Sequence, residues 1–131
     1  QLLQQPLYTC YQYIRILYYR GWIGHIGDER IEGNGKFIDT KSRITLELNM
    51  QSNPRTLTYF VNDVQQKNFV VNIPPAVRIW AFLWEKGSSF QISKFESIPF
   101  TTTSHEKKPS IPWEYGKRWI KDEKKKNCSI Q

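Results

Sequence analysis

The sequence has few of the residues that build disulfide frameworks, metal sites and catalytic centres. Its 131 residues include two cysteines and two histidines. Cys10 and Cys128 stand near opposite ends, which fits neither a disulfide framework nor a metal-ligand cluster and favours a reduced, intracellular protein. His25 and His105 lie outside any motif that pairs histidine with a nucleophile or a metal, so we expect structural or solvated roles. The sequence therefore predicts no catalytic residue, no metal and no cofactor.

Long apolar runs and targeting signals are also missing. No run approaches the length of a membrane-spanning helix, and no charged region followed by a small-residue cleavage site opens the chain. The first residue is Gln1, and the only methionine, Met50, falls inside a predicted strand. We therefore expect a cytoplasmic protein, and we expect this sequence to be a fragment or an incomplete gene model.

Aromatic residues and positive charge are what the chain does have. Aromatics make up 15% of the residues and hydrophobic residues 39%, a composition that favours packed β-structure in a single domain. The net charge of +7 is uneven, because residues 1–100 hold 11 basic and 8 acidic side chains while residues 101–131 hold 8 and 4. A basic tail of this kind suits an acidic partner, nucleic acid or an anionic membrane.

The most regular pattern lies between residues 44 and 61. Ile44, Leu46 and Leu48 alternate with polar residues, as in a strand with one buried face, and residues 57–61 resume the alternation. Residues 51–54 between them supply serine, asparagine and proline, which favour turns. The pattern predicts a β-hairpin.

Residues 62–95 extend the series. We expect a turn at 62–63, a short strand over 69–71, a bend at Pro74–Pro75, a deeply buried strand over 77–84 and a last strand that includes Phe90 and Ile92. Truncating Ile79 to alanine is then expected to cost ~2–5 kcal/mol. The residues expected to face inward are Leu46, Leu48, Leu57, Tyr59, Val77, Ile79, Ala81, Leu83, Phe90 and Ile92.

Upstream, residues 7–19 combine β-branched and aromatic residues, which favours strand over helix. Residues 21–35 carry five glycines, so we expect loops and short strands there.

The segments 48–50, 55–62, 73–74, 77–81 and 89–92 (LNM, RTLTYFVN, IP, VRIWA and SFQI) together resemble the C-terminal half of a SPRY domain, closest to the SPRY-like proteins of parasitic amoebae. The resemblance implies an all-β fold, a bent antiparallel β-sandwich over residues 1–98. It also implies loops that bind protein or peptide segments, without catalysis or cofactor. A SPRY domain has more strands before residue 44 than this chain supplies. Either the first strands are missing, which would leave an open edge, or residues 7–19 replace them.

The predicted function is a non-catalytic protein-interaction module whose partner is another protein or a peptide. Loops between strands can vary without disturbing the core, so we expect contacts in the loops around 62–68 and 85–89. The candidate partner-binding residues are Asn62, Asp63, Gln65, Lys67, Glu85, Lys86 and Ser88.

Residues 99–131 are predicted to form a basic, mostly irregular tail, with an aromatic island at 111–120 that packs on the domain or rests on a membrane interface. The last four residues, from Cys128, fit the C-a-a-X prenylation signal with a farnesyl-type ending. One lipid chain binds reversibly, and nearby basic residues strengthen the attachment. We therefore expect peripheral attachment to the cytoplasmic face of a membrane, with anion contacts from Lys117, Arg118, Lys121, Lys124, Lys125 and Lys126.

Nucleic-acid binding is the weaker alternative. Basic and aromatic residues interleave at Arg78 and Trp80 and again at 117–119, and bases stack on such rings. The alternation places Trp80 inside a buried strand, however. The basic residues at 117–119 are equally typical of a solvent-exposed or membrane-facing run of charges.

Overall fold

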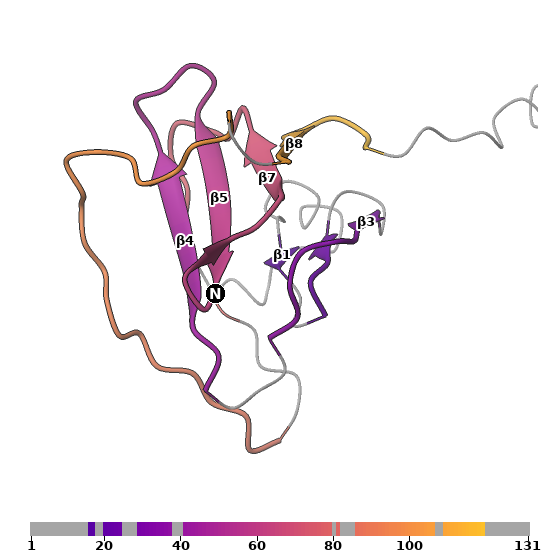
Figure 1. Ribbon diagram of the computed structural model, residues 1–131, viewed down its shortest axis with the longest axis vertical. Coiled ribbons are helices and arrows are strands. Elements are labelled where there is room, and N and C mark those ends of the chain that lie inside the picture. Colours follow the sequence, from indigo (N-terminus) through magenta and orange to yellow (C-terminus); the bar gives the residue numbers. More distant parts are fainter. Residues whose placement is uncertain are drawn as a thin grey trace, which may run out of the picture.

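The computed structural model describes residues 16–17, 20–24, 29–37, 41–79, 81, 86–106 and 109–119 (Figure 1). Within these ranges the chain forms strands, turns and extended segments without helix, so the all-β prediction is confirmed there. Accordingly, the described residues include no helix long and apolar enough to cross a bilayer. The strands form two open sheets, one of three strands and one of five.

The three-stranded sheet is built from the glycine-rich N-terminal region. Strands β1 (Ile16–Leu17), β2 (Ile23–Gly24) and β3 (Arg30–Ile31) are antiparallel and follow one another in sequence order. Gly21 has a φ of +85°, and a Cβ there would lie 2.1 Å from the carbonyl oxygen of Asn34. Only glycine fits this close approach, which brings the β1–β2 turn against the loop after β3.

The five-stranded sheet begins with the predicted hairpin. Strand β4 (Ile44–Asn49) pairs antiparallel with β5 (Thr56–Val61), with Leu46 opposite Tyr59. Asn49 Oδ1 accepts hydrogen bonds from the backbone N–H groups of residues 51 and 52, at 3.2 and 3.1 Å, which closes the turn. The predicted hairpin is therefore confirmed.

Two further strands extend β5. The short β6 (Val64–Gln65) pairs with the end of β5, and β7 (Asn68–Val71) pairs antiparallel with its beginning. The turn between β5 and β6 lies at Asn62 and Asp63, whose φ values of 49° and 66° suit these residue types. The predicted second turn and third strand are both confirmed.

Strand β8 (Ile111–Glu114) lies within the residues assigned to the tail. It pairs in parallel with β7, which makes the sheet mixed, in the order β4-β5-β7-β8. The N–H groups of Ile111 and Tyr115 bond to β7 and its flank at 2.7 and 2.8 Å, so by alternation the nitrogen of Pro112 faces outward. A proline is tolerated at this outer position because no donor is needed there.

The core lies between the two sheets. Ile23 and Ile31 from the small sheet pack with Tyr59 and Val70 from the large one and with Ile73 just after β7, and all five are buried. The predicted inward positions Leu46, Leu48, Leu57 and Tyr59 are confirmed by this cluster. The partly buried residues packed against it are Leu46, Leu48, Met50, Leu57, Trp113, Tyr115 and Trp119.

The expected fourth and fifth strands are wrong where the structure describes them. Val77, Ile79, Ala81, Phe90 and Ile92 are exposed, in extended chain without strand pairing. Alternation specifies an extended chain but not a partner, and β8 takes the place beside β7. Of the remaining residues of the predicted strand, Trp80 and 82–84, including Leu83, lie outside the described residues.

Asparagine side chains join the two sheets. Asn34, after β3, donates from Nδ2 to the Asn68 carbonyl at 3.2 Å and accepts the Asn68 N–H at Oδ1 at 2.9 Å. The Asn68 side chain donates to the Glu32 carbonyl at 2.9 Å and accepts from Trp113 Nε1 at 3.0 Å. We call these four residues the amide network. It fixes the small sheet and β8 on the first residue of β7.

The difference in burial between Ile23 and Ile79 predicts that truncating the first lowers stability and that truncating the second does not. Ile23→Ala should lower the free energy of unfolding by ~2–5 kcal/mol, because Ile23 is completely buried between the sheets. Ile79→Ala should change it by less than about 0.5 kcal/mol, because that side chain is 53% exposed. Urea unfolding of both variants measures the two changes. A cost of several kcal/mol for Ile79→Ala would restore the buried strand that the sequence suggested.

Candidate functional site

The first predicted loop lies at one end of the large sheet. Asn62 and Asp63 are exposed and contact Arg43, which donates from its backbone N–H to Asn62 Oδ1 at 2.9 Å and from its guanidinium to Asp63. Gln65 instead donates to the Ser104 carbonyl at 3.0 Å, and Lys67 is exposed with its side chain beside Gly33. Only the turn residues therefore share one surface with β4.

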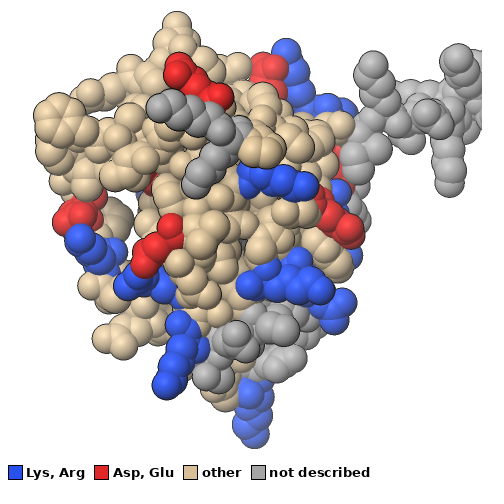
Figure 2. Space-filling view, viewed as in Figure 1, with Lys and Arg blue, Asp and Glu red and all other residues tan. Residues whose placement is uncertain are grey.

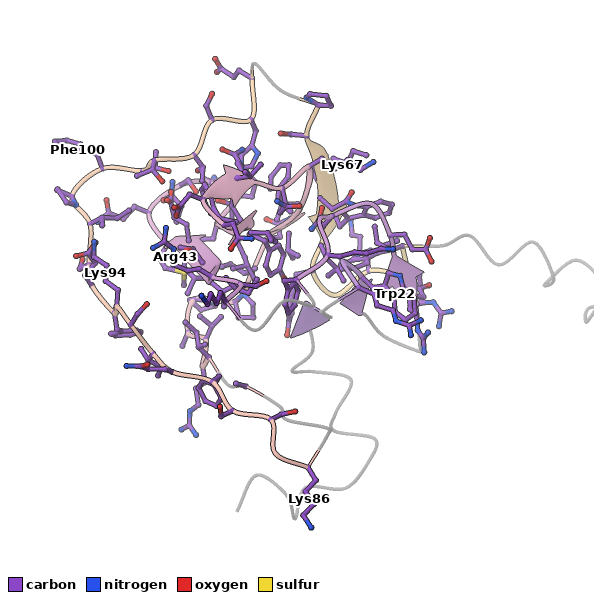
Figure 3. The ribbon with its side chains drawn as sticks, turned by 60° about the horizontal axis from the view of Figure 1, so that its bottom comes forward. Trp22, Arg43, Lys67, Lys86, Lys94 and Phe100 are labelled. Atoms are coloured by element: carbon purple, nitrogen blue, oxygen red, sulfur yellow. The ribbon has the colours of Figure 1, made fainter. Side chains whose placement is uncertain are left out.

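The second predicted loop is separate. Lys86 and Ser88 are exposed around Gly87, whose φ is +87°, and Glu85 lies outside the described residues. Lys86 and Lys67 lie far apart in Figure 3, at opposite ends of the molecule. The two loops in which the sequence predicts partner contacts therefore do not lie together.

Of the predicted anion-contact residues, only Lys117 and Arg118 lie within the described chain. Lys117 Nζ pairs with Glu114 at 3.0 Å, and Arg118 Nε donates to the buried carboxylate of Glu29 at 2.8 Å. The backbone N–H of Trp119 donates to the other oxygen of Glu29 at 2.9 Å. These contacts tie the end of the described chain to the small sheet. The remaining predicted residues, Lys121, Lys124, Lys125, Lys126 and Cys128, lie outside the described residues.

The outer face of the large sheet carries a row of side chains crossed by a later segment. The register places Glu47, Thr58 and Phe69 side by side on β4, β5 and β7. Residues 101–106, which we call the strap, run across this row (Figure 1). Thr101 Oγ1 and the Thr102 N–H donate to Glu47 at 2.7 and 3.1 Å.

The Glu47 carboxylate is stabilised in its charged form. Partial burial opposes ionisation, but the hydrogen bonds from Thr102 and Thr101 outweigh it, so the pKa of Glu47 lies below its ordinary value. Beside it, Thr45, Glu47, Phe60, Asp63 and Thr102 line a shallow depression of about 190 Å³. Acceptors and hydroxyls in this depression can hydrogen-bond to a polar ligand group.

His105 anchors the other end of the strap. Its ring stacks on Phe69 with the centroids 3.6 Å apart and the planes 9° from parallel. Nε2 lies 3.1 Å from Thr58 Oγ1, and Nδ1 lies 3.2 Å from Ser110 Oγ and 3.5 Å from Gln65 Nε2. An amide nitrogen can only donate, so Nδ1 is the acceptor and Nε2 carries the proton. Desolvation lowers the pKa of His105, although the charge of Glu47 acts in the opposite direction.

The strap therefore serves packing. Both ring nitrogens of His105 are engaged by side chains of the protein, and Thr58 is completely buried. Among the residues that the structure describes, no three His, Cys, Asp or Glu side chains are grouped to hold a metal ion.

One side of strand β4 has backbone groups that are not paired with another described strand. Among the residues that the structure describes, strand β4 pairs with β5 alone. The Asn62 N–H bonds to the Arg43 carbonyl at 2.8 Å, and backbone groups alternate in direction along an antiparallel strand. Residues 43, 45, 47 and 49 therefore face β5, while the N–H and C=O groups of Ile44, Leu46 and Leu48 point outward. We call these three residues the open edge.

An extended segment that forms no strand among the described residues lies on the same side of the molecule as the open edge. Every residue from 86 to 100 is exposed, and we call this segment the arm. It runs from Lys86 past Lys94 to Phe100 around the outside of the molecule (Figure 3). On the face drawn in Figure 2, basic side chains are interspersed with acidic ones and with large uncharged areas. That face has no single basic stripe of the kind expected of a nucleic-acid site.

Sequence reasoning did not place an open edge on β4, and it missed the arm. The edge depends on the strand order, which the alternation of β4 does not report, and the alternation within the arm is equally typical of a buried strand. The exposure of the apolar arm residues, including Phe95 and Phe100, could be seen only once β8 was located.

Comparisons with protein-family models, with curated proteins and with solved structures found no match to this chain.

The environment of His105 predicts a pH dependence of stability. Its pKa is lower in the folded chain than its ordinary 6.5, so the folded state favours the neutral ring. The stabilisation is full above pH 6.5 and is lost as the pH falls toward the folded-state pKa. The free energy of unfolding should therefore fall from pH 7.5 to 5.5 more steeply in the wild type than in His105→Gln.

Urea unfolding of both proteins at the two pH values measures this difference, and comparing the two proteins cancels the other titrating groups. Removing the stack on Phe69 should itself cost about 1 kcal/mol at pH 7.5. Parallel pH profiles for the two proteins would contradict this prediction, because they would show that the pKa of His105 is the same in the folded and the unfolded chain.

Proposed function

We propose that this chain is a non-catalytic protein-interaction module that binds an extended peptide along the open edge. The observation that carries the proposal is the row of outward N–H and C=O groups at Ile44, Leu46 and Leu48. A peptide that adds a strand to such an edge gains main-chain hydrogen bonds, and side-chain contacts beside the edge supply specificity.

The surroundings of the edge suit this role. Thr45 and the depression beside Glu47 lie on the outer face of β4, where they can contact alternate side chains of a bound peptide. The turn at Asn62 and Asp63 lies at the beginning of β4, so part of the loop predicted to bind a partner flanks the same edge. Gln65, Lys67, Lys86 and Ser88 stay predicted contacts outside this surface.

A SPRY-like β-sandwich with a basic tail belongs to the same proposal. The hairpin, the short strand after it and the two sheets around one core support the sandwich. The exposed segments 77–79 and 90–92 are where this chain departs from the expected pattern. A peptide-binding role agrees with what the SPRY resemblance implies.

One outward N–H group of the open edge can be removed and compared with a control that keeps this group but also lacks the isoleucine side chain. Ile44→Pro removes an outward N–H at the first residue of β4, where proline is tolerated, while Ile44→Ala shortens the side chain and keeps the N–H. The probes are peptides selected on the wild-type chain from a random display library. Ile44→Pro should weaken their binding about 3- to 10-fold relative to Ile44→Ala, since one hydrogen bond contributes ~0.5–1.5 kcal/mol.

Fluorescence titration measures the affinities, and backbone NMR shifts locate the peptides. Shifts confined to Lys67 or Lys86, with equal affinities for the two Ile44 variants, would contradict binding at the edge. A selection on dilute, monomeric protein that yields no binding peptide would contradict the interaction module itself.

We also propose that Cys128 is farnesylated and, with the basic residues before it, tethers the domain to a cytoplasmic membrane face. Residues 117–126 hold six basic and two acidic side chains, a local charge of +4. Because each basic residue adds up to ~1 kcal/mol of attraction to an anionic leaflet, the lipid and the charge together suffice for attachment.

Mass spectrometry of the C-terminal peptide from native cells should find a farnesyl group on Cys128 and no residues after it. Cys128→Ser should release the protein from the membrane fraction. An unmodified Cys128 still followed by Ser129, Ile130 and Gln131 would refute the tether.

A further inference from the structure

We propose that the segment bound at the open edge is the arm of a second copy of this chain, so that two copies exchange arms. The inference rests on the proposed function, because it uses the same edge of β4. It adds the identity of the partner and a symmetric mode of assembly.

The arm has the side-chain pattern of a strand with one apolar face. Phe90, Ile92, Ile98 and Phe100 all fall at even positions, which share one side of an extended chain, and they are 57%, 71%, 41% and 81% exposed. Lys94 and Glu96 occupy the even positions between them and pair at 3.0 Å. Isolated apolar residues are ordinary on a surface, but four on one face of an unpaired segment indicate a covered surface.

The arm and the open edge are complementary in backbone chemistry. The edge offers the outward N–H and C=O groups of three residues along a six-residue strand. Residues 90–96 contain no proline, so each can supply a donor and an acceptor over the length of β4. One chain thus carries both halves of a strand pair and leaves both unpaired within the described residues.

The chain path allows exchange. The strap begins at Thr101, which is held on Glu47 of β4, and the arm before it runs around the outside of the molecule on the β4 side of the sheet (Figure 1). Fifteen residues of extended chain span up to about 50 Å, enough to cross to a neighbouring copy. Exchange of identical segments about a two-fold axis closes the assembly at two copies, without an open edge at either β4.

The apolar surface is large enough for a stable pair. A buried aromatic side chain covers ~150–250 Å², so Phe90 and Phe100 on the apolar face of each arm, together with the surfaces that receive them, would bury roughly 1,200–2,000 Å² in the dimer. This estimate lies in the range of specific protein interfaces, about 1,200–2,000 Å².

Analytical ultracentrifugation of the full chain over a concentration series tests the exchange. The wild type should sediment as a monomer–dimer equilibrium. The double variant Phe90→Ser and Ile92→Ser should raise the dimer Kd at least about 100-fold, because each apolar side chain that becomes buried contributes roughly tenfold. The double variant Gln91→Ala and Ser93→Ala, at the intervening positions, should leave the Kd within about threefold of the wild type.

A mixing experiment identifies which surfaces meet. Ile44→Pro should weaken the dimer relative to Ile44→Ala. When Ile44→Pro is mixed with the Phe90→Ser and Ile92→Ser variant, the heterodimer has one intact arm–edge contact and one contact that carries both defects, so its Kd should lie between those of the two variant homodimers. A dimer that depends on Ile44 and not on the arm would show that two β4 edges pair directly, which overturns the exchange.

The inference and the proposed function fail separately. A wild-type chain that stays monomeric at every concentration, yet binds library peptides at the open edge, overturns the exchange and leaves the proposed function standing. A monomeric chain that binds no peptide at this edge contradicts both.

Discussion

The paired hydrogen bonds between Asn34 and Asn68 are the constraint on which the arrangement depends. Asn68 is almost completely buried, and four hydrogen bonds reach its side chain and backbone from the small sheet and from Trp113 of β8. An amide buried without partners costs roughly 1–3 kcal/mol per unsatisfied group, so the network forms completely or the two sheets separate. One residue at the start of β7 thereby fixes segments from both ends of the described chain.

That constraint explains why the molecule has an open edge. Because β8 is held on one side of β7 and β5 on the other, the sheet can grow only outward from β4 or β8. The Glu29 carboxylate, buried and bonded to Arg118, reinforces the choice by holding the end of the described chain near the small sheet. The arm is then left outside the core that Ile23, Ile31 and Trp113 fill.

The sequence predicted what local chemistry determines. The hairpin followed from period two and a turn rich in Asn, Ser and Pro, and the turn at Asn62 from residues that tolerate positive φ. Strand β8 was missed because Pro112 reads as a strand breaker unless its outer position is known. Asn34 and Asn68 read as loop residues, since partners 34 positions apart leave no local pattern. The location of the open edge on β4 was equally inaccessible, because it depends on strand order.

The central claim is that β4 is an edge strand whose outward backbone groups are available. Amide hydrogen exchange, followed residue by residue by NMR in dilute protein, tests it most directly. Strand order and register predict slow exchange at Thr45 and Glu47, whose N–H groups bond to β5, and fast exchange at Ile44, Leu46 and Leu48. Uniform slow exchange from residue 44 to residue 49 in the monomer would contradict the account, because another segment would then cover the edge.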